Sequence, residues 1–289
     1  MDVHVFWRVL LFLAMCAAVI VLAIALVAEP LTALHRRGLF LAALEKEPYD
    51  RAVNMIVGPL IAFGIVMSVK IAARRLDHQP LSHYGILLDA AWWKSLALGF
   101  AVAAAVMLLV FAGEWAAGML VITSLGAVSL FSIVKVLCVG VYEEFVARGY
   151  LLRNLGVVLS SLLFALLHLT NENASLLSTA GLFVNALFFA AAALFTRRLS
   201  AAIGAHIAWN LFEGSILGFP VSGDKEIASL IHIRQLGDSV ITGGAFGPEA
   251  GLVGVAASLC GIGAFYAVTR ARSPRPEARA LSSAGSPPR

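Results

Sequence analysis

The chain has 289 residues, of which 60% are hydrophobic and only 13% are charged. Its mean hydropathy of +0.90 excludes an ordinary soluble domain and indicates a protein embedded in the lipid bilayer. The formal net charge of +4 comes from basic residues placed beside apolar runs, so it does not indicate a nucleic-acid partner. All three cysteines fall inside apolar runs, which predicts buried thiols and no disulfide framework.

Apolar runs recur along the chain at the length needed to cross a membrane, about 20 helical residues for a hydrocarbon core about 30 Å thick. The first run is too long for the apolar region of a cleavable signal peptide, about 7 to 15 residues, and is interpreted as a membrane helix. The sequence therefore predicts an all-α fold, a polytopic transmembrane bundle of about eight membrane-spanning helices. The expected spans are residues 9–28, 52–69, 95–113, 115–142, 154–171, 173–196, 199–212 and 250–269.

The distribution of Lys and Arg predicts the orientation of this bundle. With eight spans both termini lie on one side, and that side collects fourteen basic residues against six on the other. Because basic residues are retained in the cytoplasm, we expect a multi-pass protein of the cell (plasma) membrane with both termini cytoplasmic. The last segment, residues 270–289, is rich in Pro, Ser and Arg and is predicted to be a disordered cytoplasmic tail.

Polar and ionisable residues interrupt three of the predicted spans. Such residues are costly in a membrane, usually face the bundle interior and are functional candidates by default. At about 1.5 Å of helical rise per residue, the four that we expect near the reacting centre lie about 12 to 18 Å from the cytoplasmic helix ends. This common depth predicts one shared cavity. The candidates are Glu143, Glu144, Arg148, His168, His206 and Asn210.

The spacing of these residues suggests their chemistry. Glu144 and Arg148 stand four residues apart and are expected to form an ion pair along one helix face. Glu143 points about 100° away from that face, which leaves it available as a general base, with His168 able to share a water molecule with it. His206 and Asn210 are also four apart and would present two hydrogen-bond donors to a developing oxyanion.

Structural roles are the alternative for each of these side chains. The pair of Glu144 and Arg148 would most often stabilise a helix end, and a single buried histidine is usually only hydrogen-bonded. Lys135 is expected to line an interhelical contact or a polar cavity. Glu213 would either support the neighbouring histidine segment or mark the end of that helix.

Three ordered motifs, "EEFVAR", "FALLH" and "HIAWN", together resemble the CAAX prenyl endopeptidase and bacteriocin-processing (CPBP or Abi) family of intramembrane proteases, and in particular its bacterial branch. The resemblance covers about residues 93–268. It divides the chain into residues 1–92, an N-terminal pair of transmembrane helices with loops; residues 93–269, the protease-like core; and residues 270–289, the tail.

The resemblance implies an endopeptidase that hydrolyses a peptide bond inside the membrane. Glu143 and His168 would activate the water, Glu144 and Arg148 would hold their helix, and His206 with Asn210 would stabilise the oxyanion. The substrate would be a peptide or membrane protein, prenylated or not. No cofactor is expected, although Glu143, His168 and His206 could form a zinc site, so a divalent metal is not excluded.

Two other functions stay open at the level of sequence. One is a non-catalytic membrane adaptor or bacteriocin-immunity protein that keeps the polar cluster for structure. The other is a transporter with a proton relay through Glu143 and His168. The sequence shows no paired, interrupted helices in two equivalent halves, which argues against a transporter.

Overall fold

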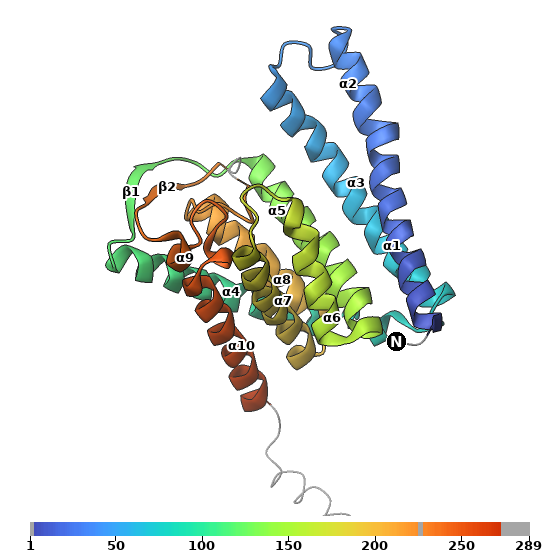
Figure 1. Cartoon of the computed structure of the whole chain (residues 1–289). Helices are drawn as coiled ribbons and strands as arrows, with labels where there is room; N and C mark the ends of the chain where they lie inside the picture. Colours follow the sequence, from blue (N-terminus) through green and yellow to red (C-terminus); the bar gives the residue numbers. More distant parts are fainter. Residues whose placement is uncertain (1–2, 225–227, 273–289) are drawn as a thin grey trace, which may run out of the picture.

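The computed structural model describes residues 3–224 and 228–272. Its long elements are all helices, so the predicted all-α class is confirmed (Figure 1). The helices are α1 (Val3–Ala23), α2 (Glu29–Arg36), α3 (Lys46–Arg75), α4 (Ala90–Ala116), α5 (Leu130–Glu144), α6 (Leu152–Leu167), α7 (Leu176–Thr196), α8 (Leu199–Asn210), the short α9 (Ser239–Thr242) and α10 (Leu252–Arg272).

Three π-helical segments extend these helices: Ile24–Ala28 after α1, Phe145–Leu151 after α5 and Leu211–Ile216 after α8. Such segments are rare and frequently mark functional sites. One of them, Phe145–Leu151, begins inside the motif "EEFVAR" and contains Arg148, and another, Leu211–Ile216, begins at the residue that follows "HIAWN". The helical geometry of the chain therefore changes at or directly beside the residues singled out from the sequence.

Side-chain caps fix where several core helices begin. Asp89 accepts a hydrogen bond from the backbone N–H of Trp92 at the start of α4, and Ser129 does the same for Ser132 at the start of α5. Ser175 opens α7 with a reciprocal capping box. Each cap satisfies a donor that the first helical turn leaves without an intrahelical partner.

Helix α8 lies at the centre of the bundle, and each of its twelve residues is buried. It packs closely on α4 because small residues face one another at the crossing. A Cβ atom added at Gly204 would lie 2.1 Å from the Leu96 carbonyl oxygen, and one added at Gly99 would lie 1.9 Å from the Ala201 carbonyl oxygen. Such backbone approach is typical of membrane helix pairs.

The N-terminal helices α1 and α3 pack on one another and stand at the side of the bundle, beside α5 and α6 (Figure 1). A buried carboxylate joins α1 to the core: Asp77 accepts hydrogen bonds from Arg8 at 3.0 Å, from Tyr150 at 3.1 Å and from Asn154 at 3.1 Å. Tyr84 donates a further hydrogen bond to the same carboxylate.

Among the described residues, six helices are long and apolar enough to cross a membrane by length and composition. The chain is thus a multi-pass membrane protein, but the expected count of about eight is not confirmed. Two features account for the difference. Leu130–Thr170 counts as one stretch although Gly156 interrupts it with φ 79° and ψ 177°. The second is α8, which with its π-helical extension is short and lies inside the bundle.

The predicted span over residues 115–142 is wrong in its first half. Helix α4 continues to Ala116, and the following segment forms β1 (Leu120–Leu125), which pairs antiparallel with β2 (Ile231–Gln235). A single apolar run can serve as strand or helix, and here a partner more than 100 residues away decides the outcome. Helix α5 begins only at Leu130.

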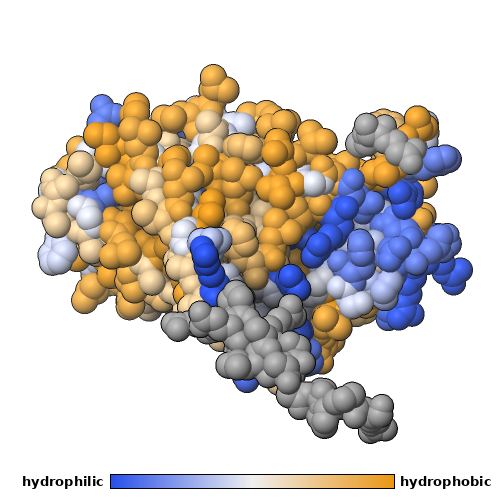
Figure 2. Space-filling model, turned by 90° about the horizontal axis from the view of Figure 1, so that it is seen from below, coloured by the Kyte–Doolittle hydropathy of each residue, from blue (hydrophilic) through white to orange (hydrophobic). Residues whose placement is uncertain are grey.

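The N-terminal end of α1 and the C-terminal end of α10 lie at the same end of the molecule (Figure 1). Viewed from that end, hydrophilic residues gather on one side and hydrophobic residues cover most of the rest (Figure 2). Large apolar side chains face outward, among them Leu109 at 71% and Leu176 at 87% exposed, as a lipid-facing surface requires. The predicted disordered tail falls, from residue 273 onward, outside the described residues.

Candidate active site

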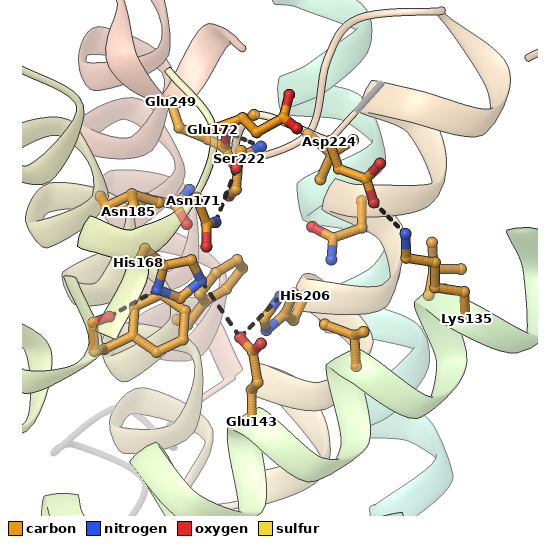
Figure 3. A pocket seen from close by; sticks show the side chains of 18 residues that line it. Lys135, Glu143, His168, Asn171, Glu172, Asn185, His206, Ser222, Asp224 and Glu249 are labelled. Carbon is orange, nitrogen blue, oxygen red and sulfur yellow. Dashed lines mark hydrogen bonds and ion pairs between the residues drawn. The ribbon is translucent and has the colours of Figure 1, made fainter. Parts of the chain in front are cut away.

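The two adjacent glutamates at the end of α5 point to different surroundings. Glu144 is fully buried, whereas the Glu143 side chain is 22% exposed and lines a cavity (Figure 3). The angular separation of neighbouring helical residues produces this division. One carboxylate therefore belongs to the protein interior and the other to the cavity.

The expected ion pair between Glu144 and Arg148 is present, with Nη1 2.8 Å from Glu144 Oε1. Arg148 also donates to the Ala186 carbonyl oxygen of α7 at 2.9 Å, and its guanidinium lies 4.3 Å from the centre of the Phe164 ring. Glu144 Oε1 in turn lies 2.8 Å from His206 Nδ1 on α8. The pair therefore connects α5 to α6, α7 and α8 and holds the Nδ1 edge of the His206 ring.

Both predicted histidines approach Glu143 from other helices. His168 Nε2 and His206 Nε2 each lie 3.9 Å from Glu143 Oε2 (Figure 3). This separation exceeds a direct hydrogen bond, and a water molecule placed between two such atoms would lie at about 2.8 Å from each. The three side chains come from α5, the end of α6 and α8, so the predicted convergence of separate helices is observed.

Hydrogen bonds fix the tautomers of the two imidazoles. His168 Nδ1 lies 2.8 Å from the Phe164 carbonyl oxygen, which can only accept, so Nδ1 carries hydrogen. In the neutral form, His168 Nε2 therefore presents a lone pair toward Glu143. His206 Nδ1 faces the carboxylate of Glu144 and must likewise donate. Its Nε2 can donate only when the ring is a protonated imidazolium.

A cavity of about 410 Å³ surrounds this cluster. Asn210, one turn after His206 on α8, lines the same cavity, so the four residues predicted to share one cavity are brought together. The Phe189 ring stacks on His206 with centroids 4.6 Å apart and holds the imidazole plane. The polar and charged side chains that complete the wall are Lys135, Asn171, Glu172, Asn185, Ser222, Asp224 and Glu249.

Most of these wall residues were not identified from sequence: Asn171 and Glu172 lie in the loop just after His168, Asn185 lies on α7, and the others lie in later loops. Lys135 was expected at an interhelical contact or polar cavity; it lines the cavity and pairs with Asp224. Asn171 donates to the Ser222 carbonyl oxygen at 2.8 Å and joins two loops of the wall. Glu249 follows "AFGP", and no local pattern distinguishes it from an exposed turn residue.

Among the described residues, no group of three or more His, Cys, Asp or Glu side chains is arranged to hold a metal ion. The predicted zinc donors, Glu143, His168 and His206, illustrate why. Ligands at 2.0–2.1 Å from a tetrahedral zinc would lie about 3.3 Å apart, whereas the nitrogen-to-oxygen distances here are 3.9 Å.

Comparison with protein families matches residues 125–212 to the family described as type II CAAX prenyl endopeptidase Rce1-like. The matched segment contains all six predicted site residues, so the resemblance is confirmed for this segment and indicates a protease of the CAAX type. The assignment to a bacterial branch stays a prediction. No curated protein and no solved structure matches the chain.

Proposed function

We propose that this chain, whose residues 125–212 match the type II CAAX prenyl endopeptidase family, is an intramembrane endopeptidase that uses Glu143 as its general base. The observation that supports this most directly is the approach of two imidazole nitrogens to one oxygen of Glu143 at equal distance. The cavity around them provides room for a peptide segment and a water molecule.

In the proposed reaction a water molecule donates its two hydrogens to Glu143 Oε2 and His168 Nε2. As the water oxygen attacks the carbonyl carbon, one proton passes to Glu143 and the carbonyl oxygen becomes an oxyanion. The carbon–nitrogen bond then breaks, and the proton held by Glu143 passes to the leaving amine. Glu143 returns to its ionised form with water and peptide consumed and two shorter chains formed.

His206 and Asn210 are proposed to stabilise the oxyanion. Because His206 Nδ1 donates to Glu144, only the imidazolium form has a second N–H for the oxyanion. Glu144 accepts the hydrogen bond from His206 Nδ1 and is itself held by the ion pair with the buried Arg148, so the orientation of the ring is fixed. The Asn210 amide provides the second donor.

We propose that the reaction needs no metal, since the donor atoms stand too far apart for a preformed zinc site. Full activity after dialysis against a chelator is expected. Loss of activity, restored by zinc alone, would contradict this part of the proposal.

The test is cleavage of quenched fluorescent peptides, with and without a prenylated cysteine, by the protein in lipid nanodiscs. Glu143→Gln and His168→Ala are expected to reduce turnover at least about 100-fold, as loss of a general base does. Glu47→Gln, on the exposed start of α3, is the control and should retain activity. Cleavage of any peptide at the parental rate by Glu143→Gln would refute the mechanism.

A non-catalytic adaptor or immunity protein of the same fold is the second candidate. If the protein is such an adaptor, Glu143→Gln should leave the cellular phenotype intact. If it is a protease, the same substitution should abolish that phenotype. An adaptor should also give no cleavage of the same peptide panel by the parent protein.

A further inference from the structure

The cavity around Glu143 does not extend along the full length of the helices that form it. Its lining residues fall within residues 135–143 of α5, 182–189 of α7 and 206–210 of α8. Helix α7 continues to Thr196 after the last of these, and α8 begins at Leu199 before the first of its own. At a rise of about 1.5 Å per residue, about 10 Å of helix separates the floor of the cavity from the junction of α7 and α8.

Buried side chains close the cavity on the side of that junction. Residues 199–205 of α8 are all buried, and so are Arg148, Tyr150 and Leu151 in the π-helical segment after α5. Core side chains in membrane bundles pack as tightly as those of soluble proteins and leave no path for a peptide chain. A substrate segment therefore does not reach Glu143 from this direction.

Polar and charged side chains form the mouth of the cavity in the opposite direction (Figure 3). The side chains of Lys135 and Asp224, which pair there, are 29% and 30% exposed, and Glu172 is exposed. Deeper in the cavity, the side chain of Glu143 is 22% exposed and that of His206 is 5% exposed. Exposure thus decreases from the mouth to the floor, and ionisable residues at this depth usually line a water-filled space. Water and peptide enter at the mouth.

The closed side of the cavity faces the end of the molecule at which the described chain begins and ends. Asp77, after α3, accepts hydrogen bonds from Arg8 of α1 and Asn154 of α6, and Arg198, between α7 and α8, pairs with Asp89 at the start of α4. The C-terminal end of α10 lies at the same end (Figure 1). We call this the terminal end, and the mouth lies at the other end.

Lys and Arg residues are more frequent at the terminal end. In the part of the chain that the structure describes, and leaving out the buried Arg148, nine lie at the terminal end and six at the mouth end. All segments between the helices are short, which is the condition under which basic residues determine orientation, and such residues are retained in the cytoplasm. The nine are Arg8, Lys70, Arg74, Arg75, Lys94, Arg153, Arg197, Arg198 and Arg270, and the six are Arg36, Arg37, Lys46, Arg51, Lys135 and Arg234.

We propose that the mouth of the cavity faces the non-cytoplasmic side of the membrane, and that the substrate is a segment of a membrane-anchored chain exposed on that side. Glu143 belongs to a membrane-spanning stretch, so a segment that reaches it must extend into the depth of the bilayer, as the outer end of an anchored chain does. The nature of the substrate rests on the proposed function. The direction of the mouth rests on the fold and the distribution of Lys and Arg alone.

The first test labels single cysteines with a membrane-impermeant maleimide in sealed bacterial spheroplasts. The full chain is used, with its three natural cysteines replaced by alanine. Glu172→Cys and Glu45→Cys report the mouth end, and Gln79→Cys reports the terminal end; all three positions are exposed, and none of the substitutions removes a Lys or Arg. Glu172→Cys and Glu45→Cys should be labelled to the same extent before and after permeabilisation, whereas Gln79→Cys should be labelled only afterwards. The reverse pattern would overturn the proposal.

The second test adds a quenched fluorescent peptide, too polar to cross the membrane, to the same sealed spheroplasts. The parent protein should cleave it before permeabilisation, and Glu143→Gln should not. Cleavage that begins only after permeabilisation would overturn the proposed direction of the mouth and leave the protease function intact. Absence of cleavage in both states would instead reject the protease function, while the labelling pattern still decides which side the mouth faces.

Discussion

Replacing Arg148 by methionine should strongly destabilise the fold. Arg148 is 3% exposed and Glu144 is 0% exposed, so both charges are shielded from water. Methionine keeps most of the side-chain volume but removes the donor to Glu144 at 2.8 Å and the donor to the Ala186 carbonyl oxygen at 2.9 Å. Glu144 would then be a buried carboxylate with His206 as its remaining hydrogen-bond partner among the described residues.

Breaking a buried ion pair by removing one partner costs about 3 to 5 kcal/mol, because the remaining charge stays desolvated. We expect a loss of this size in the free energy of unfolding. The double variant Glu144→Gln/Arg148→Met removes both charges and should recover at least about 2 kcal/mol of the loss. The non-additivity of the two substitutions then measures the coupling of the pair.

The assay is reversible unfolding by SDS in lipid–detergent bicelles, followed by tryptophan fluorescence. Arg51 and Glu47 form an ion pair with the same spacing, but their side chains are 32% and 67% exposed. Arg51→Met is thus a matched control, with an expected loss below about 1 kcal/mol. Equal losses for Arg51→Met and Arg148→Met would refute the assignment of Glu144 and Arg148 as a buried structural pair.

Two further predictions concern the packing and capping of α4. Gly204→Ala should destabilise the fold by about 1 to 3 kcal/mol, because the new Cβ would collide with the Leu96 carbonyl oxygen. Gly263→Ala is the control and should not destabilise the fold, because the space around Gly263 is open. Unfolding of both variants in SDS measures the difference. The bidentate contact with Arg198 lowers the pKa of Asp89. The ionised Asp89 therefore stabilises the fold fully above the pKa of about 3.9 that it has in the unfolded chain, and this stabilisation is lost as the pH falls through the lower pKa of the folded state. Asp89→Asn should accordingly destabilise the fold at pH 7 but not at strongly acidic pH.

The part of the site that sequence predicted depends on helical spacing. The pairing of Glu144 with Arg148 follows from their separation of four residues, and the meeting of Glu143, His168 and His206 follows from similar depths on adjacent apolar helices. These are local rules applied to strongly periodic segments. The roles of these residues in catalysis stay predictions.

The parts that sequence missed depend on contacts between distant segments. Residues 120–125 form a strand only because residues 231–235 pair with them, and no local sequence pattern predicts that pairing. Glu249 is buried because Gly181 of α7 and Gly254 of α10 have no side chains, which lets the turn at residues 248–250 pack closely between the two helices. A carboxylate that reads as a surface residue in "GPEAG" is thus placed in the interior by tertiary structure.

The complete burial of α8 limits how this protein can change over evolution. A helix whose every side chain is enclosed tolerates few substitutions, so the rotation and depth of His206 and Asn210 are effectively constant. Variation in what the cavity accepts must then arise in the surrounding loops, which carry Asn171, Ser222 and Asp224. Relatives with different preferences should therefore differ first at these rim positions, while the central helix stays nearly unaltered.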